Sequence, residues 1–295
     1  MRRLRPLLLA PGLAVALVVG CGGGDSDSNA TVVTDSPAAS TPAQSVQSAR
    51  HAGDWPRFGY DIGRANDAPR GISASKVAGL SEQRVKLAGT VDSSPIYFSR
   101  VRVNGRNRAL LVMTTTYGKT LGVDASSGAT LWTFTPSSYS QVAGSPQITT
   151  ATPVADPSDR YVYAASPDGL IHKLRVSNGS QVRSGHWPAR TTVNPSHEKI
   201  ASSLNLDGRY VLVTTGGYIG DAPPYQGKVL AINRSNGRVT HVFNSLCSNR
   251  RQIINPTTCS AQESAIWGRA GAVVDPVTHR VYATSSNGAW NGSTN

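Results

Sequence analysis

The fold is decided by the stretch Val123-Asp124-Ala125-Ser126-Ser127-Gly128-Ala129-Thr130-Leu131-Trp132. An apolar run leads into Asp124, small turn-forming residues follow to Gly128, and a second run begins at Thr130. Asp at the start of a turn and Gly near its end favour a tight reversal between two extended segments. The stretch therefore predicts two antiparallel strands joined by a short turn.

Related units recur along the chain. The glycines that close them, Gly128, Gly179 and Gly237, lie 51 and 58 residues apart. Each unit contains three or four short β-rich runs separated by turns such as Asn104-Gly105 and Asp207-Gly208. A four-stranded unit of about 50 residues cannot bury both of its faces alone, whereas radial stacking around an axis buries them. The regular period predicts an all-β fold, a β-propeller of four-stranded blades, in preference to a two-sheet sandwich.

The composition agrees with many short strands. Only 16% of the 295 residues are charged, and Gly (29) and Pro (18) are abundant, whereas soluble domains carry about 25% charged residues. This composition argues against helical bundles and coiled coils. The 29 Lys and Arg exceed the 17 Asp and Glu, for a net charge of +12.

The first twenty residues predict an export signal. Three arginines precede an apolar run from Leu7 to Val19, which Pro11 and Gly12 interrupt. A membrane-spanning helix needs about 20 unbroken apolar residues, so the run is typical of a cleaved signal, residues 1–20. The segment Val18-Val19-Gly20-Cys21 resembles a bacterial lipobox, which implies lipid on Cys21; the alternative is an ordinary secretion signal. Removal of residues 1–20 leaves a net charge of +9.

Residues 21–53 predict a disordered tether, because they contain no aromatic residue and no sustained apolar periodicity. As a flexible coil this lipidated tether would reach about 30 Å. Residues 54–295 form the predicted propeller. The expected location is the outer side of the bacterial cytoplasmic membrane or the periplasm, with the membrane as one partner and no nucleic acid.

Two cysteines remain after lipidation of Cys21. In an oxidising compartment Cys247 and Cys259 are expected to form a structural disulfide. A bridge across this short loop would stabilise the fold by about 3 kcal/mol on the chain-entropy model. No further Cys or His motif nearby supports a zinc site.

The repeat resembles a known family. Residues 123–132 resemble the repeat of quinoprotein alcohol dehydrogenase-like propellers, called PQQ-like repeats, in which the Trp docks on the neighbouring blade. The opening Asp54-Trp55-Pro56-Arg57-Phe58-Gly59 resembles the start of the same domains. The resemblance covers about residues 54–295 and implies a ring of seven or eight blades. Four to five blades' worth is present, which predicts a fragment of a longer protein; a four-bladed ring is the alternative.

The resemblance also implies site residues. Trp267 would stack on the quinone PQQ and Asn287 would ligate Ca²⁺. The departures are a missing adjacent Cys pair and a missing Glu in residues 216–221, where only Asp221 carries a charge. The catalytic Asp would lie beyond residue 295. Trp267 as a packing residue between blades is the alternative.

Two function classes follow. The first is a binding or scaffold module that contacts a protein or polymer of the cell envelope. The alternative is a PQQ- and Ca²⁺-dependent alcohol dehydrogenase of the polyvinyl-alcohol type, so enzyme activity stays open at this stage. A weaker third is a sugar- or polymer-binding propeller. Separately, four arginines flank the Asn104-Gly105 turn and form either a solvated hairpin or a contact for anionic lipids and wall polymers: Arg100, Arg102, Arg106 and Arg108.

Overall fold

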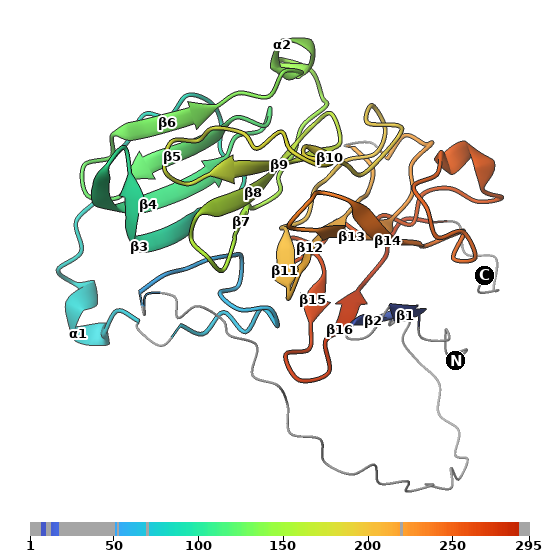
Figure 1. Ribbon diagram of the computed structural model, residues 1–295, viewed down its shortest axis with the longest axis horizontal. Helices are drawn as coiled ribbons and strands as arrows, with labels where there is room; N and C mark the ends of the chain where they lie inside the picture. Colours follow the sequence, from blue (N-terminus) through green and yellow to red (C-terminus); the bar gives the residue numbers. More distant parts are fainter. Residues whose placement is uncertain are drawn as a thin grey trace, which may run out of the picture.

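The computed structural model describes residues 51, 53–68, 71–218 and 221–288, together with the backbone of two short strands, β1 (Leu7–Leu9) and β2 (Leu13–Leu17). The chain forms four four-stranded sheets (Figure 1). Helical structure is limited to α1 (Ala74–Val77), α2 (Tyr139–Val142) and one 3₁₀ turn (Pro256–Thr258) in this part of the chain.

Three sheets follow the chain order or its reverse, with antiparallel neighbours throughout. The first sheet consists of β3 (Ile96–Val103), β4 (Arg106–Thr114), β5 (Thr120–Asp124) and β6 (Thr130–Phe134). The second consists of β7 (Val154–Ala155), β8 (Tyr161–Ser166), β9 (Leu170–Arg175) and β10 (Ala189–Arg190). The third consists of β11 (Asn205–Asp207), β12 (Tyr210–Thr214), β13 (Lys228–Asn233) and β14 (Val239–Asn244).

The fourth sheet is different. Here β15 (Val273–Val274) pairs antiparallel with β16 (Arg280–Ala283), and β16 pairs in parallel with β2, which in turn pairs with β1. Both β1 and β2 fall within the predicted export signal, whose cleavage stays a prediction. The predicted tether lies outside the described residues apart from His51 and Gly53.

The core lies between consecutive sheets, as a propeller requires. One cluster joins Phe98 and Leu110 of the first sheet to Val162 and Leu174 of the second, with Trp132 among them. Similar clusters join the second sheet to the third and the third to the fourth. Strands β5 and β12 are buried at every position. The third sheet is covered by sheets on both sides, and the first by the second sheet and by Leu87 and Val91. The predicted all-β propeller architecture is confirmed.

The connections divide into two faces of the molecule. The turn face carries the links from first to second and from third to fourth strand of each sheet, and the loop face carries the others. Hydrogen bonds join neighbouring sheets at the turn face: Asn104 N–H donates to Ser177 O at 2.9 Å, and Arg234 Nη1 to Asp156 Oδ2 at 2.9 Å. The turn ends therefore lie side by side.

No helix in the described residues is long and apolar enough to cross a membrane.

Candidate functional site

The site residues implied by the sequence lie on the loop face, where the third and fourth sheets meet. Asn287 follows β16 and its Nδ2 donates to Asp221 Oδ2 at 2.5 Å. Its carbonyl accepts from Ser264 N at 2.5 Å. The structure thus brings Asn287 together with Asp221, 66 residues earlier in the chain.

Trp267 stands in the long connection between β14 and β15 and is half-buried. Its Cβ faces Gly216, where an added Cβ would lie 3.4 Å from it. In the part of the chain that the structure describes, no hydrogen bond or ring contact joins Trp267 to Asn287 or Asp221. The two implied site residues share a face, and Asn287 is bonded there to a carboxylate.

Tyr225 completes this cluster. Its side chain is fully buried, and its ring lies against Gly217, where an added Cβ would be 2.6 Å from the ring. Burial, together with the charges of Asp221 and Glu263, raises the pKa of the Tyr225 hydroxyl to about 12. The phenol is protonated at neutral pH, as an ordinary tyrosine is. The structure shows no hydrogen-bond partner of this buried hydroxyl among the described residues.

The backbone of the same cluster is strained. Four non-glycine residues adopt positive φ, a conformation that costs about 1–3 kcal/mol each and that concentrates at functional sites. They are Asp221 (46°), Glu263 (84°), Ser264 (55°) and Asn287 (57°). Because four such residues converge here, the cluster of Asp221, Tyr225, Glu263, Ser264 and Asn287 is the candidate site.

The described residues do not fit the calcium and quinone of a dehydrogenase. Ca²⁺ takes six to eight oxygen ligands, several of them anionic. Among the residues in view, no group of three or more His, Cys, Asp or Glu side chains could hold a metal ion. Asn287 uses its amide nitrogen on Asp221. No catalytic step through these groups is derived.

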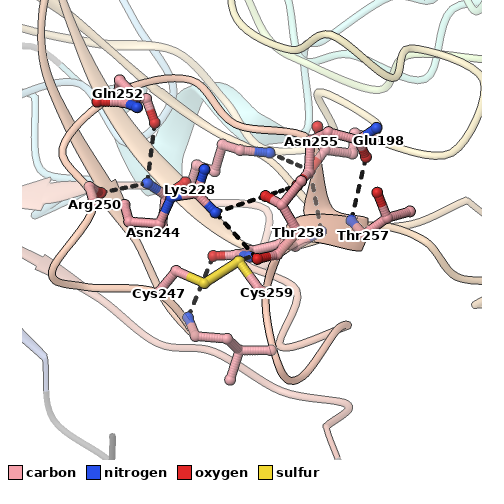
Figure 2. Close-up of a disulfide and its surroundings, with 12 residues drawn as sticks. Glu198, Lys228, Asn244, Cys247, Arg250, Gln252, Asn255, Thr257, Thr258 and Cys259 are labelled. Atoms are coloured by element: carbon pink, nitrogen blue, oxygen red, sulfur yellow. Dashed lines mark hydrogen bonds and ion pairs between the residues drawn. A yellow bond between two sulfur atoms is a disulfide. The ribbon is translucent and has the colours of Figure 1, made fainter.

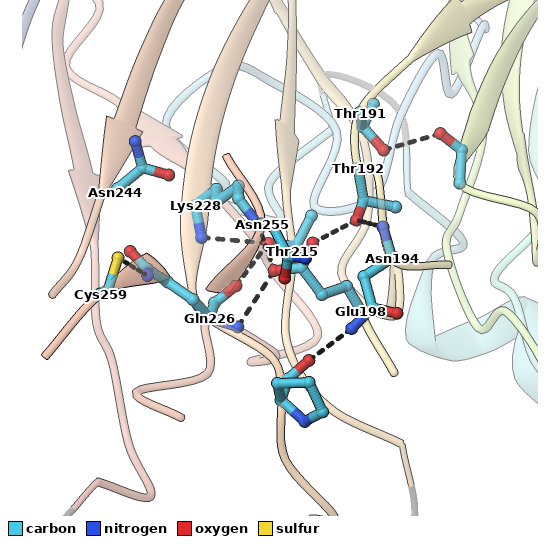
Figure 3. A network of polar contacts seen from close by, with 12 residues as sticks. Thr191, Thr192, Asn194, Glu198, Thr215, Gln226, Lys228, Asn244, Asn255 and Cys259 are labelled. Carbon is cyan, nitrogen blue, oxygen red and sulfur yellow. Dashed lines mark hydrogen bonds and ion pairs between the residues drawn. The ribbon is translucent and has the colours of Figure 1, made fainter. Parts of the chain in front are cut away.

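The sequence analysis missed a buried ion pair beneath this face (Figure 3). Glu198 and Lys228 are both fully buried, and Lys228 Nζ donates to Glu198 Oε1. The same oxygen accepts from Gln226 N at 3.1 Å, and Thr192 Oγ1 donates to Oε2. Burial lowers the pKa of Lys228, while Glu198 opposes the shift. The one available signal was a lysine at the start of the apolar run 229–232.

Gln226 connects this ion pair to the disulfide. Its Nε2 lies 3.1 Å from Cys259 Sγ, and its Oε1 accepts from Leu246 N at 3.3 Å. Cys247 and Cys259 are bonded to each other, as predicted, with their Cα atoms 6.1 Å apart. The loop is thus attached to buried strand structure.

Further bonds hold the disulfide loop, residues 247–259, in one shape (Figure 2). Asn244 Nδ2 donates to the carbonyls of Arg250 (2.7 Å) and Gln252 (3.1 Å). Arg250 Nη1 donates to Thr258 Oγ1 at 2.6 Å, which ties the two halves of the loop together. The loop exposes a set of polar side chains: Asn249, Arg251, Gln252, Asn255, Thr257 and Thr258.

A cavity of about 250 Å³ lies between the connection that carries Trp267 and the fourth sheet. Its lining includes Ile266, Arg269, Tyr282 and Thr284 but neither Trp267 nor Asn287. The cavity and the candidate site are therefore separate places.

Solved structures with the same fold support the architecture. The chain is similar to the quinohemoprotein alcohol dehydrogenase of Comamonas testosteroni (17% identity, TM-score 0.60, covering 82% of this chain and 36% of that one). It is also similar to the quinohemoprotein alcohol dehydrogenase ADHIIG of Pseudomonas putida HK5 (17%, TM-score 0.62, 81% and 35%). A europium-containing methanol dehydrogenase gives 16% identity and a TM-score of 0.50, over 77% of this chain and 41% of that one.

The chain spans about a third of the length of the two quinohemoprotein dehydrogenases. No family model matches the chain, and no curated protein matches it in sequence. At such low identity the likeness concerns the fold alone, and it confirms the resemblance to PQQ-like propellers at that level.

Proposed function

We propose that this PQQ-like β-propeller is an exported lipoprotein, anchored through Cys21, whose loop face is a binding or scaffold module of the cell envelope. One observation carries the proposal. The disulfide loop is long and polar, yet its shape is held by the Cys247–Cys259 bond, Asn244 and Arg250. Pre-organised loops bind with a smaller entropic cost than flexible ones. We expect a partner, a protein or a polymer, that presents carboxylate and amide groups to Arg251 and its neighbours.

Crosslinking in cells tests the proposal. A photo-crosslinking residue at exposed Gln252 should trap one discrete partner, whereas the same residue at exposed Ser158, on the turn face, should not trap that partner. Cys247→Ser with Cys259→Ser should abolish the Gln252 adduct while the secondary structure is retained. A Gln252 adduct that survives loss of the disulfide, or an equal adduct at Ser158, would contradict the proposal.

The anchor has its own test. Cys21→Ser should move the protein from the membrane fraction to the soluble envelope fraction, and the wild-type protein should carry the mass of a diacylglycerol on Cys21. An unmodified cysteine in the wild-type protein would reduce the proposal to a secreted binding module.

A second candidate is a PQQ- and Ca²⁺-dependent alcohol dehydrogenase. The likeness of the fold to quinohemoprotein alcohol dehydrogenases supports this candidate, although the described residues do not form a calcium site. A PQQ-binding experiment separates the two candidates. Quinone fluorescence and calorimetry measure the binding of PQQ to the mature protein with Ca²⁺ present, and Trp267→Ala is the control. Micromolar binding that the variant loses would make the dehydrogenase the primary function. Absence of PQQ binding would rule out the dehydrogenase candidate.

A further inference from the structure

The chain enters the propeller at the turn face. Trp55 and Tyr97 exchange two main-chain hydrogen bonds of 2.8 Å as an antiparallel bridge. Asp54 Oδ1 accepts from the N–H of Ser99 at 2.6 Å. Because this pairing is antiparallel, residues that precede Trp55 lie alongside residues that follow Tyr97 in β3. Strand β3 runs from there past Ser99 to Val103, where it ends at the turn face. Gly53 and Asp54, where the predicted tether would join the domain, therefore lie toward that side.

Exposed arginines gather at the same face. Arg102 and Arg106 flank the Asn104-Gly105 turn of the first sheet, and Arg160 and Arg175 flank the turns of the second. The two pairs belong together, because Asn104 N–H donates to Ser177 O and Val176 N–H to Arg160 O. Within the described ranges, none of these four guanidinium groups forms an ion pair with a carboxylate.

The aspartates of this face are already engaged. Asp124 binds Arg108 at 2.6 Å, Asp156 binds Arg234 at 2.9 Å, and Asp207 lies 2.9 Å from His279 Nδ1. Asp275 accepts from two main-chain N–H groups of its own turn, those of Val277 and Thr278. Two of these aspartates have a guanidinium partner, one has a histidine and one has main-chain donors, while the four exposed arginines form no ion pair among the described residues.

Exposed apolar side chains lie at this end as well. Val277, at the tip of the β15–β16 turn, is 84% exposed. Ile72 (63%), Val77 (54%) and Leu80 (62%) surround α1, which Figure 1 shows on the side of the first sheet where β4 and β6 begin. The segment that follows α1 reaches the turn face, since Val85 packs against Gly128 in the β5–β6 turn.

We propose that the turn face docks on an anionic lipid bilayer, so that the loop face with its disulfide loop points away from the membrane. Stable membrane attachment takes two signals, and a lipid chain with a basic patch is such a pair. The orientation of the domain in this inference rests on the proposed lipid anchor at Cys21. The bilayer is the occupant because cations, exposed apolar tips and the exit of the tether coincide on one face.

Vesicle binding of the unlipidated Cys21→Ser chain tests the face independently of the anchor. The protein should co-sediment with phosphatidylcholine vesicles that contain phosphatidylglycerol about tenfold more strongly than with phosphatidylcholine alone, and salt should weaken the difference. The double variant Arg102→Gln with Arg106→Gln should lose most of this preference for vesicles that contain phosphatidylglycerol. The matched pair on the loop face, Arg190→Gln with Arg251→Gln, should leave it in place.

Orientation gives a second readout. In the same Cys21→Ser chain, an environment-sensitive dye on Val277→Cys should shift its emission to the blue with anionic vesicles, and the dye on Val193→Cys, a 53% exposed apolar position on the loop face, should not. Equal losses in the two arginine pairs, or equal dye shifts, would overturn the inference. If the Cys21→Ser chain does not bind anionic vesicles but the Gln252 crosslink still forms in cells, the docking inference is wrong and the proposed function is unaffected.

Discussion

Trp132 is the residue that joins two blades. Its indole Nε1 donates to Val176 O at 3.0 Å, across the gap between the first and second sheets. The ring needs two glycines: a side chain on Gly122 would overlap it, and a Cβ on Gly179 would come within 2.6 Å. Gly179 also has φ of +72°, in the region that glycine occupies without strain. At this boundary a turn glycine in the second blade thus packs on an aromatic residue of the first.

Trp132→Phe should lower the free energy of unfolding by about 2 kcal/mol, because Val176 O loses its donor in a buried place and the smaller ring leaves a cavity. Urea denaturation followed by far-UV circular dichroism measures the change. Leu131→Ala, at a half-buried neighbour in the same strand, is the control and should cost less. A loss below about 0.5 kcal/mol would show that this contact does not hold the blades together.

His172 gives the protein a pH dependence at the same boundary. Its ring lies 4.7 Å from that of Phe134 in the first sheet, and Nε2 is 2.7 Å from Ser166 Oγ. Burial lowers its pKa from 6.5 to about 4, with Asp168 opposing the shift. The unfolded chain therefore binds a proton at higher pH than the folded one, so stability is full above pH 6.5 and falls as the pH drops toward 4.

The loss from this one group should approach about 3 kcal/mol at the lower pH. Unfolding free energies at pH 7.5 and at acidic pH measure it, and His172→Gln should show a flatter profile than the wild type. Equal slopes in the two proteins would assign the acid sensitivity to other groups.

At the scale of elements, β13 carries a charge into the core. Lys228 begins this buried strand, and its partner Glu198 lies in the connection before β11. Thr192 Oγ1 and Gln226 N also donate to this carboxylate. A buried pair of this kind is costly to break, because removal of one partner leaves the other charged and unpaired in the interior.

Lys228→Met should therefore destabilise the protein by about 3–5 kcal/mol, and adding Glu198→Gln should recover most of that loss. Thermal denaturation of both variants at neutral pH measures the coupling. If the double variant is no more stable than the single one, the lysine acts by packing its methylene chain and not by its charge.

At the scale of the whole molecule, the two faces have different chemistry. The loop face has the disulfide loop and the candidate site, and the turn face has exposed arginines around aspartates that are already paired. The stacking of sheets places the first-to-second and third-to-fourth strand connections on one side and the other connections on the opposite side. One face is therefore available for attachment and the other for a partner.

Calcium should have little effect on the whole protein. Because the described residues contain no metal-ligating group of three or more His, Cys, Asp or Glu side chains, millimolar Ca²⁺ or a chelator should shift the melting temperature by less than about 1 °C. Differential scanning calorimetry of the mature protein measures this, with Asn287→Ala alongside. A larger rise that Asn287→Ala abolishes would support the dehydrogenase candidate.

The repeat period, the turn residues, the docking role of Trp132 and the disulfide were all within reach of the sequence. The period and the turns depend on local conformational preference and on a pattern that returns at a regular interval. The docking role of Trp132 followed from the family resemblance, and the disulfide from the number of cysteines in an oxidising compartment. The propeller prediction followed because a unit of four strands must bury both of its faces.

The pairing of Glu198 with Lys228, the contact of Asp221 with Asn287 and the position of Asp54 at the turn face came only from the tertiary structure. These contacts join loops of variable length from different strands or different sheets, and loop conformation carries no period that a sequence displays. The packing of one sheet on the next decides which loop ends meet, and with them the candidate site and the face that we propose to dock on a membrane.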